Sequence, residues 1–167
     1  MDEACIGRNE VRRLVIALTG AVLTFAAYGG TSLADKPVPS TFVAVLSSGE
    51  ETGVCSGISD SARGVAVFHV TDDTTGTVEW QIVANNLPGT TSAAHIHIGP
   101  PGVAGPVVQP LSGVAGNEQG VIATGSFTNP ALLAALRANP GNYYVNVHTS
   151  PNCPGGVIRG QVGDHGP

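Results

Sequence analysis

Two histidines, His95 and His97, occupy alternate positions of a short segment whose apolar pattern predicts a β-strand. Because side chains alternate between the two faces of a strand, both imidazoles leave one face while Ile96 leaves the other. A third histidine, His148, lies near the end of a second predicted strand, 143–149, on its polar side. Three imidazoles are a common ligand set for zinc or copper and leave a further position for water or substrate. The pattern therefore predicts a metal site at these histidines. The alternative is that they are solvated or bonded to backbone.

Two further polar residues are predicted to lie beside this site. Asn146 is on the polar side of 143–149, and Arg159 is on the polar side of the predicted strand 156–162. If these strands pair as a hairpin, the two side chains face each other on one surface. Arg159 would then guide a small anion toward the metal. The alternative, which we favour, is that Arg159 bonds backbone carbonyls or an acid such as Glu118, and that Asn146 is a hydrogen-bonding brace.

Residues 1–34 are predicted to be a secretory signal peptide. Arg12 and Arg13 precede an apolar run over 14–27, and small residues ending at Ala34 follow it. The apolar run is shorter than the roughly 20 residues of a membrane-spanning helix, although an uncleaved N-terminal anchor is the alternative. We therefore expect a secreted or periplasmic protein that has no membrane association after cleavage.

The rest of the chain suits one domain. We expect a lead-in segment over 35–40, a domain over 41–163 and a tail over 164–167. The net charge is −5 and no basic run is present, which argues against nucleic acid as a partner. Charged residues make up only 11% of the chain, which contains 23 glycines and 12 prolines. This composition favours strands joined by tight turns.

Removal of the signal peptide leaves two cysteines, Cys55 and Cys153. In an oxidising compartment two remaining cysteines most simply form a disulfide, and two free thiols are the alternative. The bridge would close a loop of nearly 100 residues, for which the chain-entropy model gives about 4–5 kcal/mol of stabilisation.

Turn signals divide the predicted domain into short strands. We expect strands over 41–46, 64–70, 77–84, 94–98, 121–127, 143–149 and 156–162. A helix is predicted over 131–138, because Asn129 can cap it, Pro130 suits its first turn and Asn139-Pro140-Gly141 ends it. The fold class is therefore all-β: an antiparallel immunoglobulin-like or Greek-key β-sandwich of about seven to eight strands with one short helix. The Pro/Gly-rich segment 99–106 is predicted to be a rigid loop at one end of the sandwich, beyond the histidines.

Several motifs follow one another in order across the predicted domain, and together they resemble the CHRD domain, a module first described in chordin and found in microbial secreted proteins. They are the opening stretch 41–51 and the stretches 93–99, 105–108, 129–136, 142–149 and 154–162. The resemblance implies an immunoglobulin-like β-sandwich, usually without an assigned biochemical activity. The chain lacks the cysteine-rich modules that accompany these domains in chordin, so antagonism of bone morphogenetic proteins is not carried over.

A weaker resemblance is to the copper-zinc superoxide dismutase sandwich. It implies that His95, His97 and His148 are copper ligands and that the cysteine pair parallels the dismutase disulfide. The chain departs from that pattern because it lacks a bridging histidine, a zinc-binding loop and an acidic electrostatic loop. A dismutase site also has four copper histidines, and the spare histidines here are His69 and His165.

These observations predict an exported, non-catalytic CHRD-type binding module that holds a copper or zinc ion and has an extracellular protein as a further partner. A copper-dependent redox enzyme of dismutase type with the same ligands is the first alternative. An extracellular adhesion or matrix module with purely structural histidines is the second. Hydrolase chemistry finds no support, because no Gly-x-Ser-x-Gly elbow is present.

Overall fold

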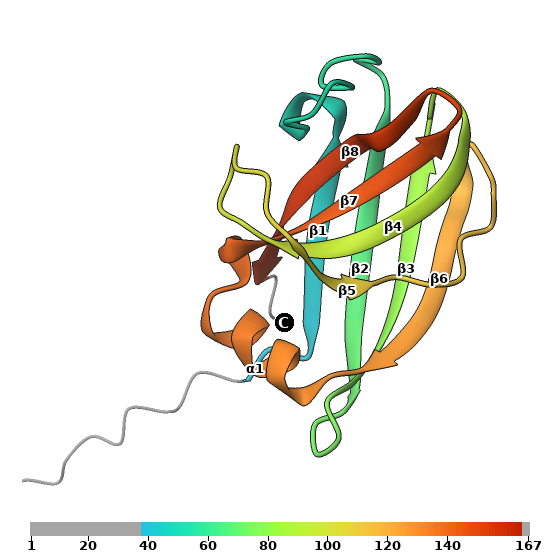
Figure 1. Cartoon of the computed structure of the whole chain (residues 1–167). Coiled ribbons are helices and arrows are strands. Elements are labelled where there is room, and N and C mark those ends of the chain that lie inside the picture. The colour runs from blue at the N-terminus through green and yellow to red at the C-terminus, as the bar shows by residue number, and fades with distance from the viewer. Residues whose placement is uncertain (1–37, 165–167) are drawn as a thin grey trace, which may run out of the picture. The chain divides into compact units, whose positions relative to one another are not determined.

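A computed structural model describes residues 38–164, which form a curled antiparallel sheet (Figure 1). Eight strands run in the spatial order β5-β4-β7-β8-β1-β2-β3-β6. The sheet curls so that β4, β7 and β8 pass in front of β1, β2, β3 and β6 (Figure 1). The predicted all-β, sandwich-like class is confirmed, and both layers belong to one continuous hydrogen-bonded sheet. The predicted signal peptide lies outside the described residues.

The strands are β1 (Thr41–Ser47), β2 (Arg63–Asp72), β3 (Thr77–Asn85), β4 (Thr90–Ile98), β5 (Val107–Pro110), β6 (Gly120–Thr128), β7 (Tyr143–Ser150) and β8 (Cys153–Asp164). The helix α1 (Pro130–Ala138) follows β6. Two single-turn 3₁₀ helices complete the fold: η1 (Ser48–Glu50) directly follows β1, and η2 (Pro140–Asn142) directly precedes β7. Seven of the strands coincide with predicted ones to within a few residues. The remaining strand, β5, was not predicted. β8 continues through Asp164, so the strand includes the first residue of the predicted tail.

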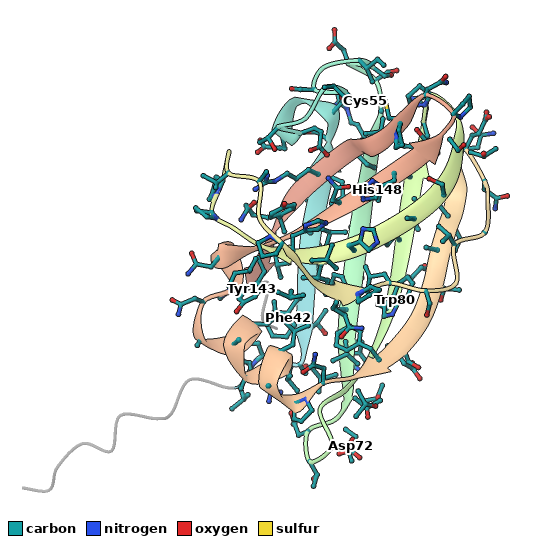
Figure 2. The ribbon with its side chains drawn as sticks, in the orientation of Figure 1. Phe42, Cys55, Asp72, Trp80, Tyr143 and His148 are labelled. Carbon is teal, nitrogen blue, oxygen red and sulfur yellow. A yellow bond between two sulfur atoms is a disulfide. The ribbon has the colours of Figure 1, made fainter. Side chains whose placement is uncertain are left out.

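The core lies between the two layers and follows from the alternation of side chains in the strands. In β2 and β3 buried and exposed residues alternate along most of each strand, which places Phe68 and Trp80 in the core. Phe42 from β1 is also buried, and Figure 2 labels Phe42 and Trp80. Ile96 from β4 is fully buried, so the opposite side of β4, which carries the two histidines, faces away from this core.

The predicted helix is confirmed together with its cap. The Asn129 side chain accepts a hydrogen bond of 3.0 Å from the Leu132 backbone N–H, which satisfies one of the free donors of the first turn. Pro130 takes the first helical position, where its missing N–H costs nothing. The helix buries its three leucines, Leu132, Leu133 and Leu136, against the core.

The disulfide between Cys55 and Cys153 is present. It ties the segment after η1 to the first residue of β8, across 98 positions of the chain. Within residues 38–164, no helix has the length and apolarity needed to cross a membrane.

Candidate metal centre

The candidate site is built on three adjacent strands, β4, β7 and β8. The sheet places His95 opposite Asn146, and Asn146 opposite Arg159, so these three residues form one row across the sheet. The predicted hairpin of β7 and β8, with its Asn146–Arg159 pair, is therefore confirmed. His97 is opposite Tyr144, one step further along the same face.

The three histidines meet on this face. Nδ1 of His95 lies 3.0 Å from Nε2 of His148, and the two rings are close to perpendicular. The ring centroids of His95 and His97 are 5.6 Å apart. One nitrogen from each of the three rings lies within 4.8 Å of the others. Figure 2 shows His148 on β7, beside β4. The structure thus brings together the three residues that the sequence marked as metal ligands.

Backbone carbonyls fix which nitrogens are free to bind. Nδ1 of His97 lies 2.8 Å from the Gly105 carbonyl oxygen, and Nδ1 of His148 lies 2.8 Å from the Pro154 carbonyl oxygen. A carbonyl only accepts, so each Nδ1 carries the proton and each Nε2 presents a lone pair. The lone pair of His148 Nε2 therefore accepts a hydrogen bond from Nδ1–H of His95, and a metal ion bound here would displace that proton. The Nε2 atom of His97 is buried and has no hydrogen-bond partner among the described residues. Imidazole ligands of metals are oriented by such an outer N–H bond.

The protonation of the site favours neutral imidazoles. Burial lowers the pKa of His95, and the nearby His148 and His97 lower it further. Burial also lowers the pKa of His97, and the bond to the Gly105 carbonyl only partly opposes this effect. A metal competes with protons for ring nitrogens, so a lowered pKa keeps these ligands available at neutral pH.

A buried carboxylate, Glu51, contacts Asn146 of the same site. It was not among the site residues predicted from the sequence. Its Oε2 atom accepts a 2.7 Å bond from Nδ2 of Asn146, and its Oε1 atom accepts a bond from the backbone N–H of Thr52. The charge of Glu51 also acts on His97. Glu50, the preceding residue, is exposed, and nothing in the local sequence distinguishes the two glutamates.

Gly156 makes room for the bond between Glu51 and Asn146. Its φ is +120°, and an added Cβ would lie 2.5 Å from Nδ2 of Asn146 and 2.7 Å from Oε2 of Glu51. A side chain here would therefore displace the pair as well as strain the backbone. This glycine at the start of the predicted closing strand is a requirement of the site.

Arg159 is held in a structural position. It is 1% exposed, and its guanidinium carbon lies 3.4 Å from the centroid of the Tyr144 ring. Its Nη2 atom donates to the Pro100 carbonyl at 2.9 Å and to Oε1 of Gln161 at 3.1 Å. The expected bond from Arg159 to a backbone carbonyl is therefore present. The carboxylate next to the site belongs to Glu51 rather than to Glu118. Its Nη1 atom is buried without a partner among the described residues.

One expectation about the surroundings of the site was wrong. The loop 99–106 folds back over the histidine face instead of lying beyond it, because Gly105 bonds His97 and the Tyr144 hydroxyl, and Pro100 bonds Arg159. The side of β7 and β8 away from the core is consequently covered. Asn146 is only 4% exposed, and its bond to Glu51 fits the predicted hydrogen-bonding brace. The histidines themselves remain half-buried.

Comparison with known proteins places the chain in a family. The CHRD domain family model matches residues 42–162, which is most of the chain. Among solved structures, the chain is similar to the one titled "Crystal Structure Analysis of the clock protein EA4", with 18% identity and a TM-score of 0.47, over 77% of this chain and 97% of that one. No significant match is found among curated proteins. From the family match, the chain belongs to the CHRD domain family.

Proposed function

We propose that this protein is an exported, non-catalytic CHRD module that binds one copper or zinc ion through Nδ1 of His95, Nε2 of His97 and Nε2 of His148. The observation that carries the proposal is the buried Nε2 of His97, which has no hydrogen-bond partner in the described part of the chain, beside the close pair formed by His95 and His148. A buried polar atom without a partner is costly, and a metal ion would satisfy it. The donor set consists of three imidazole nitrogens, which suits both zinc and copper.

Export is part of the same proposal. It is supported by the disulfide, because structural disulfides persist in oxidising compartments, and by the predicted signal peptide in the first 34 residues. An extracellular protein is proposed as a further partner, in keeping with a family whose members usually lack an assigned activity.

The test is metal loading of the purified protein. The protein is stripped with a chelator, dialysed against Cu²⁺ or Zn²⁺ and analysed for metal content, with electron paramagnetic resonance of the copper form to count nitrogen ligands. We expect one ion per chain and a copper spectrum with three nitrogens. A stripped protein that retains neither metal after loading would overturn the proposal and favour an adhesion module with structural histidines.

A second candidate function, a copper-dependent redox enzyme of dismutase type, is favoured by one observation. The Nη1 atom of Arg159 is a buried cationic donor that no group within residues 38–164 accepts from, and the charge of Arg159 acts on His97. Such a group would attract a small anion such as superoxide toward a metal on the histidines. A superoxide-consumption assay of the copper-loaded protein decides between the two. Consumption that is lost when His95 and His148 are both replaced by alanine favours the enzyme, and bound copper without consumption favours the binding module.

A further inference from the structure

Four valines form a continuous apolar row on the outer face of the layer opposite the histidine site. Val45 of β1 pairs with Val65 of β2, Val65 pairs with Val83 of β3, and Val83 pairs with Val121 of β6. Their side chains are 66%, 38%, 37% and 42% exposed in that order. We call Val45, Val65, Val83 and Val121 the valine row.

The row continues into a wider apolar surface. Val67 is 39% exposed and lies opposite Val43, so a second pair of valines flanks the row. Three members of the valine row also line an open depression of about 290 Å³. Single exposed apolar residues are common, but an aligned set on four neighbouring strands is typical of an interaction surface.

Charged residues border this surface at both ends. Arg63 lies on β2, one pair beyond Val65, and Glu79 lies on β3, on the far side of Val67, where it pairs with His69. Both side chains are exposed. The face therefore carries a cation at one end, valines in the middle and a carboxylate at the other end.

We propose that this face binds a second copy of the same chain, with a two-fold axis that lies between the two faces and runs across the strands. Such an axis reverses the strand direction, so it places the Arg63 end of one copy over the Glu79 end of the other. Each dimer then gains two equivalent Arg63–Glu79 contacts, and the valines of both copies pack against each other. A two-fold interface requires a self-complementary surface of this kind.

The size of the face indicates a weak dimer. Four strands at about 4.8 Å spacing and seven residues at about 3.4 Å rise cover about 450 Å² per copy. The total of about 900 Å² is below the range of stable interfaces and falls among weak ones. The dimer should therefore appear only at high protein concentration. This inference does not depend on metal binding, because the face belongs to the other layer.

The test is sedimentation equilibrium of the purified protein between about 10 µM and about 1 mM, a range in which weak dimers are populated. We expect a reversible monomer–dimer equilibrium for the wild type. Val65→Asp should weaken dimerisation at least tenfold, since it buries a charge against valines. Val54→Asp is the matched control, because Val54 is 97% exposed and lies outside the face, and it should leave dimerisation unchanged. Val65→Thr, which preserves strand propensity, should also weaken dimerisation. This variant serves as the test if Val65→Asp does not fold.

Charge reversal tests the orientation. Arg63→Glu alone and Glu79→Arg alone should each weaken the dimer by about tenfold, because two attractive contacts become repulsive. The double variant should return to within about threefold of the wild type, because opposite charges meet again. A wild type that stays monomeric at about 1 mM, or a double variant no better than the single ones, would overturn the proposal.

Discussion

Nδ1 of His95 lies 3.0 Å from Nε2 of His148, although 53 positions separate the two residues in the chain. The contact exists because β4 and β7 are neighbours in the sheet, and because the Pro154 carbonyl holds the other nitrogen of His148. This pair, with the buried Nε2 of His97, defines the proposed metal site, and four predictions follow from its surroundings.

Loss of a ligand should weaken metal binding. His148→Ala removes one of three nitrogens, and we expect the affinity for Cu²⁺ or Zn²⁺ to fall by at least about 100-fold, beyond the loss usual for outer-shell changes. Equilibrium dialysis with metal analysis measures it. His69→Ala is the matched control, since His69 is exposed on the outer face of β2 and bonds only Thr41 among the described residues. Equal affinities of the two variants would contradict the site.

Asn146 should stabilise the fold through Glu51. Asn146→Ala leaves the buried Oε2 atom of Glu51 without its 2.7 Å donor, and we expect the free energy of unfolding to fall by about 2–3 kcal/mol. Urea denaturation followed by circular dichroism measures this. Asn85→Ala, an exposed position in β3, should change stability by no more than about 0.5 kcal/mol. A loss of the same size in both variants would show that the bond to Glu51 contributes nothing.

The metal-free protein should lose stability as the medium becomes acidic. The pKa values of His95 and His97 are lowered from 6.5 in the folded chain, chiefly by burial. Below pH 6.5 the unfolded chain therefore binds more protons than the folded chain, and stability declines until the pH passes the folded pKa values. Well above pH 6.5 both states hold these two rings neutral, so they no longer make the free energy of unfolding depend on pH. Denaturation midpoints between about pH 5 and 8 should show this decline, and it should be smaller in the His95→Gln, His97→Gln double variant.

Asp72 does not interfere with that measurement. Hydrogen bonds from Thr75 and Thr74 lower the pKa of its carboxyl from 3.8, so its contribution to stability is present above that value and is lost at more acidic pH.

A His95→Gln, His97→Gln double variant with the same pH dependence as the wild type would show that the two histidines are not responsible.

The disulfide should contribute to both stability and metal binding. The Cys55→Ser, Cys153→Ser double variant should be about 4–5 kcal/mol less stable, because the bridge closes a long loop in the unfolded chain. Its metal affinity should also fall by about tenfold, because Cys153 precedes Pro154, whose carbonyl orients His148. Urea denaturation and equilibrium dialysis measure the two effects. Unchanged affinity in the variant would show that the Pro154 carbonyl holds its place without the bridge.

Local sequence determined most elements and part of the site. Alternation along single strands placed His95 and His97 on one face and Ile96 in the core, since this pattern depends only on neighbouring residues. The capping residues around α1 determined its start and end for the same reason. The short connection between β7 and β8 made their pairing predictable, and with it the Asn146–Arg159 row.

Tertiary structure alone decided how the site is completed. The four-residue strand β5 carries too little pattern to be recognised before its partner β4 is in place. Glu51 is distant in sequence from Asn146 and reaches it only because β1 lies beside β8 in the sheet. The loop 99–106 covers Arg159 through contacts with residues far along the chain. Burial of a polar side chain depends on what packs over it, and that depends on the order of strands in the whole sheet rather than on the alternation within one strand.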